Sequence, residues 1–463
     1  SQVDYLCKAR GIKVADKIAI QTMRRHSNSQ EPLSGEDLKY DARALTLFIS
    51  AVFEERIPHE VNVLIPHINR PFQKGLEINN RRIRCIVKNW DSDFIRVDID
   101  QDADEEEYLV RLKDEENHID HTYLWDLLKE GMQLNLLDCQ VKQPIITPRL
   151  IVVEPDYLVD ISSIATCFTA FGHHPLLYLL NLMKPRANTQ ATLLGNFAGA
   201  ALDDIINSHG KYQVNETVKS NFREKALEFC TCPWFDAKKF YTDASLQAFN
   251  LQQVVDILFP RTASQAKMSA FRGESLYDRK KAILEPSFVC EALGIQGRVD
   301  LMTTDCKLLV EQKSGRNMNI ETHQVDPAYH SYQLEPHYVQ LLLYYGVLQH
   351  NFKLSNDRVN IRLLYSKYQP QDGLMVVAYY QKLFKEAIEY RNQLVAASFE
   401  IAKEGFEHAL NEFTPEVLNV SGTQDFFYNK YLKPQIEAIT NPLHDLSPLE
   451  EAYFCRMMTF VLR

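Results

Sequence analysis

Asp300, Glu311 and Lys313 are the residues whose types and spacing point most directly to chemistry. They lie in two short apolar runs, which the polar residues 303–307 separate. Two such runs around a polar break predict a β-hairpin, in which Glu311 and Lys313 share one face because side chains alternate along a strand. If the turn is centred on 305–306, Asp300 lies opposite Glu311, with the two Cβ atoms about 5 Å apart.

Two carboxylates at this distance repel each other, and the repulsion raises the pKa of at least one of them. A divalent cation removes the conflict, because hard cations bind carboxylate oxygens. The hairpin therefore predicts a metal site that holds Asp300 and Glu311 beside the ammonium of Lys313. A surface hairpin with one ordinary Glu–Lys ion pair is the simpler interpretation of the same short pattern.

A third element, residues 337–346, favours the metal site. This apolar stretch predicts a buried helix that carries Gln340 and Tyr344 on one face, with His337 one turn earlier. The three motifs are G-x-V-D, E-x-K-S-G and Q-x-x-x-Y, in this order. Together they resemble the PD-(D/E)XK nuclease superfamily, in the branch typified by the RecB nuclease domain, over roughly residues 155–350.

The resemblance implies a mixed sheet flanked by helices and metal-dependent cleavage of DNA phosphodiesters. The residues with catalytic roles in this resemblance are Asp300, Glu311, Lys313, Gln340 and Tyr344. The first two bind Mg²⁺ or Mn²⁺ together with the backbone carbonyl of Gln312, so that the metal neutralises the charge of the reacting phosphate. The lysine holds the attacking water, and which group takes its proton stays open. In this resemblance Gln340 and Tyr344 orient the site and contact the DNA backbone.

A narrower resemblance rests on residues 155–160, on the Leu194-Gly195 motif and on strands ahead of the nuclease core. These features resemble the nuclease portion of the flap-processing helicase–nucleases, which act on single-stranded DNA and flaps in replication and repair. No G-x-x-x-x-G-K-[ST] loop is present in the chain. A helix that starts at the capping box of Ser447 runs without a stop signal to Arg463. In the proteins that these features resemble, a helicase follows the nuclease module, so the resemblance implies a helicase partner in cis beyond Arg463.

The sequence departs from the family at two points. Many relatives carry a histidine ligand where this chain has Gly199; Asp203, one turn later, is a substitute ligand in one interpretation and a solvated or capping residue in the other. Many relatives also bind an iron–sulfur cluster through four cysteines. Here His174 stands at the early cysteine position and only Cys455 follows the nuclease core, so no iron–sulfur cluster is expected. The Cys230–Cys232 pair is expected to be structural.

The expected fold class is α/β (α+β overall). Residues 1–55 predict a helical segment, and residues 56–154 predict short strands that form a small barrel of the OB type, starting with a strand at 59–66. Such barrels often bind single strands, although a barrel that only braces the nuclease fits equally well. The nuclease core is expected at 155–350, and a helical extension at 351–463.

Composition limits the possible partners. The chain has 463 residues, a formal net charge of −10 and nine scattered cysteines, which suits the reducing cytoplasm. No apolar run approaches the roughly 20 residues that span a bilayer, so no membrane partner is expected. DNA needs local positive charge, and two stretches offer it: Arg81, Arg82, Arg84 and Lys88; and Arg261, Lys267, Arg272, Arg279, Lys280 and Lys281. In the alternative interpretation, each stretch is an ordinary solvent-exposed face of the protein.

Two functions follow from these patterns. The first is an active, metal-dependent nuclease that cleaves single-stranded DNA or flaps. The second is a weak or inactive, nuclease-derived module that binds DNA as a scaffold, which the glycine at 199 favours. The intact set of site residues favours the first. A CRISPR-adaptation-type nuclease belongs to the same superfamily, but the long N-terminal barrel argues against it.

Overall fold

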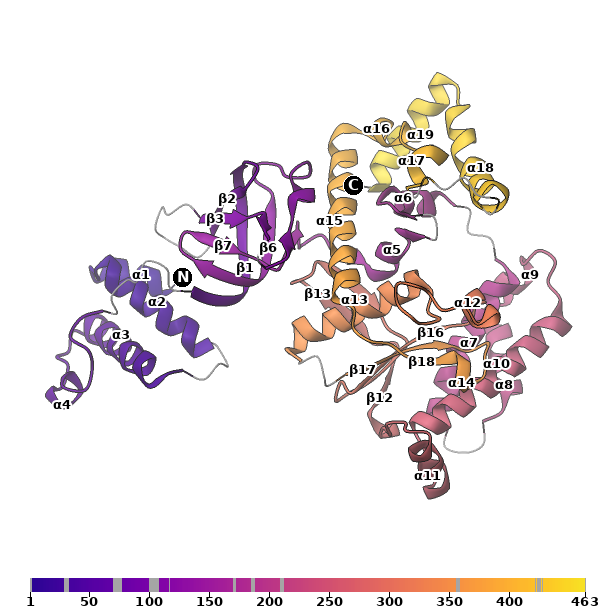
Figure 1. Ribbon diagram of the computed structural model, residues 1–463, viewed down its shortest axis with the longest axis horizontal. Helices are drawn as coiled ribbons and strands as arrows, with labels where there is room; N and C mark the ends of the chain where they lie inside the picture. Colours follow the sequence, from indigo (N-terminus) through magenta and orange to yellow (C-terminus); the bar gives the residue numbers. More distant parts are fainter. Residues whose placement is uncertain are drawn as a thin grey trace. The chain divides into compact units, whose positions relative to one another are not determined.

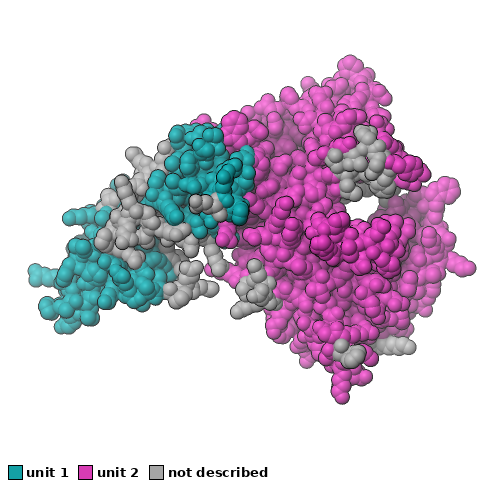
Figure 2. Space-filling model, viewed as in Figure 1, with its two compact units in different colours: residues 1–81, 88–122, 138–148 teal, residues 82–87, 123–137, 149–463 magenta. Residues whose placement is uncertain are grey.

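Figure 1 shows the computed structural model of the chain. Every structural statement below refers to the residues that it describes: 2–28, 33–69, 77–99, 108–115, 117–169, 172–184, 188–208, 212–354, 359–420, 422, 426 and 428–462. The chain divides into two compact units (Figure 2), the first formed by 1–81, 88–122 and 138–148, the second by 82–87, 123–137 and 149–463.

The first unit opens with three helices, α1 (Gln2–Ala9), α2 (Val14–Asn28) and α3 (Gly35–Phe53). They share a small core around the buried residues Cys7, Ile20 and Ala44. Ser34 caps α3 by accepting the N–H of Asp37 at 3.1 Å, which satisfies one of the donors left open at a helix start.

The predicted strand at 59–66 is wrong. Its first half forms a single helical turn, α4 (His59–Asn62), which begins after Pro58. Of its alternating apolar residues only Ile65 is buried, whereas Val63 and Leu64 are exposed. An alternating pattern forms a strand only where a sheet buries one of its faces, and here no face is buried.

The barrel prediction is confirmed. Five strands close on themselves in the order β1-β2-β3-β7-β6 and back to β1, and β8 extends the sheet from β6. β3 and β7 are parallel, and β2–β3, β6–β7 and β6–β8 are antiparallel. The bounds are β1 (Glu77–Trp90), β2 (Phe94–Ile99), β3 (Tyr108–Arg111), β6 (Gln133–Lys142), β7 (Ile145–Thr147) and β8 (Leu150–Val153).

Alternating burial explains these strands. In β2, Ile95 and Val97 are fully buried while Arg96 between them is exposed, as expected of a strand with one face on a core. A short hairpin and one 3-10 turn lie between β3 and β6: β4 (Lys113–Asp114), β5 (Ile119–Asp120) and η1 (Thr122–Leu124).

The second unit is built around a mixed five-stranded sheet in the order β12-β15-β16-β17-β18. β16 and β17 are parallel, and every other neighbouring pair is antiparallel. Helix α13 (Glu335–Phe352) carries the chain from β16 to β17, as a parallel pair requires. The bounds are β12 (Ala282–Leu284), β15 (Leu301–Thr303), β16 (Leu308–Lys313), β17 (Asn360–Tyr365) and β18 (Leu374–Val376).

Helices cover both faces of this sheet (Figure 1). Met302, Leu309 and Leu363 pack into one core with α13, α5 (Ile161–Ala165) and α15 (Gln381–Glu404). Their neighbours Leu301, Leu308, Val310 and Leu364 pack into another core with α7 (Gln190–Asn207) and α10 (Ala237–Leu258). By strand alternation, Asp300, Glu311 and Lys313 belong to the face that α13 covers.

Two smaller sheets and further helices complete the second unit. The small sheets are β13-β14-β9, with β14 parallel to β9, and the β10–β11 hairpin. Their strands are β9 (Val159–Asp160), β10 (Phe168–Thr169), β11 (Gly172–His173), β13 (Ser287–Cys290) and β14 (Ile295–Arg298). The remaining helices are α6 (Leu176–Met183), α8 (Val214–Glu224), α9 (Ala226–Cys230), α11 (Ala263–Phe271), η2 (Arg279–Lys281), α12 (Met318–Thr322), α14 (Pro370–Gly373), α16 (Glu407–Leu410), α17 (Pro415–Leu418), η3 (Tyr428–Leu432), α18 (Lys433–His444) and α19 (Pro448–Leu462).

The prediction of helices alone after residue 332 is wrong for β17 and β18. The run Asn360–Tyr365 is short and apolar, and periodicity alone does not separate such a run from a buried helix turn. This run forms a strand because it pairs with β16. The sheet that holds Glu311 is thus completed beyond the expected core boundary at 350. None of the described helices is long and apolar enough to cross a membrane.

Candidate active site

The β15–β16 hairpin brings Asp300 and Glu311 opposite each other, as their spacing predicts. β15 pairs with β16 in the register Leu301 to Val310 and Met302 to Leu309, and the same register places Asp300 across from Glu311. Asp300 directly precedes β15, and its Oδ2 accepts the backbone N–H of Gln312 at 2.6 Å. This bond fixes the first carboxylate against the strand that carries the second.

Glu311 is a buried carboxylate that is only partly paired. Its side chain is 5% exposed, and Oε1 accepts a 2.7 Å hydrogen bond from Lys313 Nζ. Oε2 is buried with no hydrogen-bond partner among the described residues. Burial and then the charge of Asp300 raise the pKa of Glu311 to about 7, although Lys313 opposes the shift. Burial also raises the pKa of Asp300, against the Gln312 N–H and the charge of Lys313.

This donor set fits a hard divalent cation. Both side chains offer carboxylate oxygens, and the unpaired Oε2 of Glu311 is a buried acceptor. Among the described residues, no group of three or more His, Cys, Asp or Glu side chains is disposed to hold a metal. Mg²⁺ is often held by one or two carboxylates and completes its shell with water and substrate phosphate. Asp300 and Glu311 would therefore suffice as its protein side-chain ligands.

Helix α13 supplies the third motif. Tyr344 donates a 2.7 Å hydrogen bond to the carbonyl of Arg298 on β14, and its ring lies so close to Gly297 that a Cβ there would be 2.9 Å from it. Burial raises the pKa of Tyr344, and the charges of Glu311 and Asp300 add to this effect. Gln340 is half-buried on the preceding turn. Gly297 of the G-x-V-D motif is thus required by the close approach of Tyr344.

Helix α7 passes the carboxyl end of β16. A Cβ on Gly195 would lie 3.2 Å from Ser314 Oγ, whereas a Cβ on Gly199 would meet open space. Burial raises the pKa of Asp203 to about 6, with further contributions from Glu285, Asp204 and Asp300. Asp203 therefore lies within electrostatic range of the site, but it does not complete a group of three metal-binding side chains in the described part of the chain.

The first basic stretch and half of the second are engaged in local pairing. In the first stretch Arg82, Arg84 and Lys88 each pair with a carboxylate, and the side chain of Arg81 lies outside the described residues. In the second stretch, Arg261 and Arg279 donate to backbone carbonyls at the C-terminal end of α7. These side chains serve local structure, so their charges add less to a DNA-binding surface than their number implies.

The residues in place of an iron–sulfur site have local roles. His174 Nδ1 accepts the N–H of Leu176 at 3.1 Å, just inside the start of α6. Cys455 is buried, and so is Cys232, while Cys230 is exposed; all are free thiols. Beside His174, His173 lies between Glu335 (2.8 Å) and Glu386 (2.7 Å).

Three interactions near the site were not predicted by any motif in the sequence. His337 Nδ1 lies 2.9 Å from the hydroxyl of Tyr365, the β17 residue that faces Lys313 in the sheet register. Glu321 contacts Arg316 and Lys367. The one available signal was the position of Arg316, three residues after Lys313.

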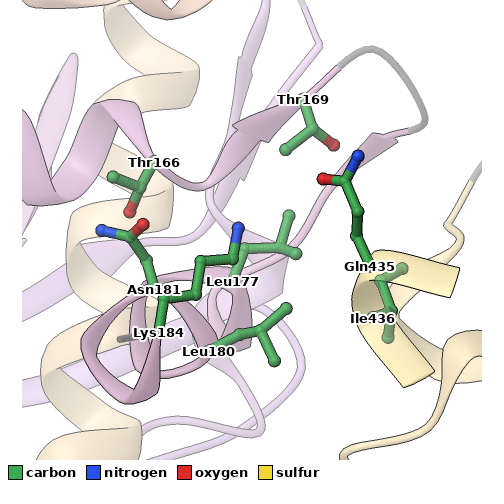
Figure 3. Close-up of a pocket in the computed structure, with 8 residues that line it drawn as sticks. All are labelled: Thr166, Thr169, Leu177, Leu180, Asn181, Lys184, Gln435 and Ile436. Atoms are coloured by element: carbon green, nitrogen blue, oxygen red, sulfur yellow. The ribbon is translucent and has the colours of Figure 1, made fainter. Parts of the chain in front are cut away.

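A separate cavity of about 110 Å³ lies between the start of the β10 hairpin, α6 and α18 (Figure 3). Its polar lining includes Asn181 and Lys184, with Gln435 on the opposite side. None of the residues predicted for the site lines this cavity.

The chain matches no model of a known protein family, and no curated protein matches it.

Proposed function

We propose that this chain is a metal-dependent nuclease that cleaves phosphodiesters of single-stranded DNA or flaps. The observation that carries the proposal is the pair of buried, opposed carboxylates, Asp300 and Glu311, of which the second has an unpaired oxygen next to Lys313. Like charges are rarely buried together without a cation. The order of sheet and helix elements supports assignment to the PD-(D/E)XK superfamily.

In this proposal Asp300 and Glu311 hold Mg²⁺ or Mn²⁺, with the carbonyl of Gln312 as a further ligand. The bound ion would neutralise charge on the phosphate and lower the pKa of a bound water. Lys313 is hydrogen-bonded to Glu311, so its ammonium is oriented to hold the attacking water. Tyr344, fixed by its bond to the Arg298 carbonyl, orients the site with Gln340 and contacts the DNA backbone.

The barrel supports a single-stranded substrate. Its closed order β1-β2-β3-β7-β6, with a parallel β3–β7 pair, is compatible with the five-stranded OB type that often binds single strands. In the proposed assignment the chain is the nuclease module of a helicase–nuclease of replication and repair.

Cleavage of end-labelled single-stranded DNA with Mg²⁺ or Mn²⁺ tests the proposal. We expect EDTA or Glu311→Gln to reduce cleavage at least about a hundredfold. Asp305→Asn is the matched control, because Asp305 lies at the turn of the same hairpin and pairs with Lys281; it should cleave like the parent. Cleavage that survives in Glu311→Gln would contradict the proposed site.

A second function is a DNA-binding scaffold with weak or no catalysis. The open space beside Gly199 and the lack of a third metal-binding side chain in the described residues favour it. Binding of DNA by a parent chain that does not cleave it with either metal would favour the scaffold.

A further inference from the structure

Two cationic side chains lie just after the ends of central strands, at the same edge of the sheet as the proposed active site. Arg316 follows Lys313 at the end of β16, and Lys367 follows Tyr365 at the end of β17. Lys313 and Tyr365 face each other in the parallel pair, so both cations lie just beyond the carboxyl ends of neighbouring strands. In open α/β sheets this is the edge at which ligands bind.

One carboxylate holds both cations. Glu321 on α12 accepts a hydrogen bond from Arg316 Nε on one oxygen, and on the other oxygen it accepts Lys367 Nζ at 3.2 Å and the hydroxyl of Tyr368 at 2.9 Å. Although burial opposes the shift, these hydrogen bonds lower the pKa of Glu321 to about 2. The carboxylate is therefore ionised near neutral pH, and two positive charges against one negative charge leave the group cationic.

Both cations remain accessible. The side chain of Arg316 is 64% exposed and that of Lys367 is 40% exposed. Arg316 contacts Glu321 through Nε. Its two terminal nitrogens have no hydrogen-bond partner among the described residues. A guanidinium offers such a pair of donors to two oxygens of one phosphate.

The group is ordered before any ligand binds. The backbone N–H of Asn317 donates to the Tyr368 hydroxyl at 2.8 Å, which ties the segment after β16 to the segment after β17. Lys367 Nζ lies 5.7 Å from the centre of the Tyr368 ring. Groups fixed in this way lose little entropy on binding, unlike the free lysines of a solvated surface.

We propose that Arg316 and Lys367, positioned by Glu321, form a binding site for one phosphodiester of the DNA strand, next to the phosphate that a metal ion on Asp300 and Glu311 would bind. This inference rests on the proposed nuclease function and deepens it. The shared carboxylate brings both cations to the same anion, so the site neutralises one phosphate rather than two.

Salt dependence of DNA binding tests the site without any cleavage. The probe is a fluorescent oligo-thymidine bound by the full chain in EDTA, with the dissociation constant measured by anisotropy between low and moderate NaCl. Each phosphate contact on a single strand contributes about 0.7 to the slope of log affinity against log salt. We expect the double variant Arg316→Ala/Lys367→Ala to reduce the magnitude of this slope by about 0.7.

The matched control is Lys219→Ala/Lys403→Ala, which removes two exposed cations that are paired with Glu216 and Glu404 elsewhere in the second unit. It should keep the parent slope. An equal change in both double variants would overturn the site, because it would reflect net charge alone. A reduction of about 1.4 would overturn the shared phosphate and indicate two separate contacts.

The test of the phosphate site and the test of the nuclease function can fail independently. A parent chain that cleaves DNA, together with an unchanged slope in Arg316→Ala/Lys367→Ala, would reject the phosphate site alone. A parent chain that does not cleave DNA, together with the expected slope change, would reject the nuclease and retain a phosphate-binding surface. Both cations are exposed, so we expect circular dichroism of the double variant to match the parent.

Discussion

Lys313 Nζ donates a 2.7 Å hydrogen bond to Glu311 Oε1, yet the pKa of Glu311 is raised to about 7 rather than lowered. Burial and the opposed carboxylate of Asp300 outweigh the ammonium. The ion pair alone therefore does not neutralise the hairpin, and a cation with the carboxylates as ligands would do so.

This relationship predicts a pH-dependent stability of the metal-free protein. The folded-state pKa of Glu311 is about 7, against an ordinary 4.5, so its contribution to stability is fully present below pH 4.5 and is lost as the pH rises through 7. The loss amounts to about 3 kcal/mol at pH 8. We expect Glu311→Gln to unfold at higher urea than the parent at pH 8 in EDTA, and to show little difference at pH 4.5.

Mg²⁺ provides the control for this prediction. It should raise the melting temperature of the parent at pH 8, because it binds the folded carboxylates, and it should leave Glu311→Gln nearly unchanged. The same gain in both proteins would mean that the ion binds elsewhere. An Asp305→Asn protein should respond like the parent, since that carboxylate lies at the far end of the hairpin, paired with Lys281.

Lys313→Met tests the proposed role of the ammonium. The variant keeps a side chain of similar length and removes the charge that is hydrogen-bonded to Glu311. We expect cleavage to fall by about a hundredfold or more, the range typical of a lost acid–base or positioning group. Lys281→Met, which removes a cation paired with Asp305 on the same hairpin, should retain parent activity. Equal activity of the two variants would remove Lys313 from the mechanism.

The two glycines beside the site predict opposite responses to one added methyl group. A Cβ at Gly297 would lie 2.9 Å from the Tyr344 ring, whereas a Cβ at Gly199 would meet nothing within 4 Å. We expect Gly297→Ala to cost about 1–3 kcal/mol of stability and to reduce cleavage, because Tyr344 must move. Gly199→Ala lies within α7 and should stabilise by up to about 1 kcal/mol. Urea denaturation of both variants measures the contrast.

The hairpin could be predicted from sequence because its information is local. Apolar runs, a polar break and strand alternation define which residue faces which, and the register of Leu301 with Val310 agrees with the expected centre of the turn. The barrel could be predicted for the same reason, since alternating apolar residues in runs such as 94–99 indicate a half-buried strand. The capping box predicted at Ser447 is present in one half, the backbone N–H of Ser447 donating to Glu450 at 2.9 Å.

What escaped prediction depends on contacts between distant segments. Nothing local marks Asn360–Tyr365 as a strand, because its pairing with β16 is made across the whole of α13. The cationic group of Arg316 and Lys367 exists only because Glu321 holds residues from two strand ends together. Conversely, Arg279 was expected in a basic patch, but its guanidinium caps α7 instead. Charge counts from sequence do not separate such structural cations from available ones.

Arg391 is the clearest case of such a structural cation. It is fully buried on α15, and its guanidinium donates to four backbone carbonyls, at Val153, Gly294, Glu154 and Tyr157. Burial lowers the pKa of its guanidinium to about 9. The donors of one arginine therefore bind carbonyls from two segments that precede the β15–β16 hairpin.

We expect Arg391→Met to destabilise the protein by about 3–5 kcal/mol, because it removes four hydrogen bonds from a buried guanidinium while filling much of the same volume. Arg223→Met is the matched control, since Arg223 is exposed on α8, and should change stability by less than about 0.5 kcal/mol. The midpoint of urea unfolding measures both. Similar midpoints for the two variants would mean that water replaces the guanidinium, and that Arg391 does not hold α15 to the segments around Val153 and Gly294.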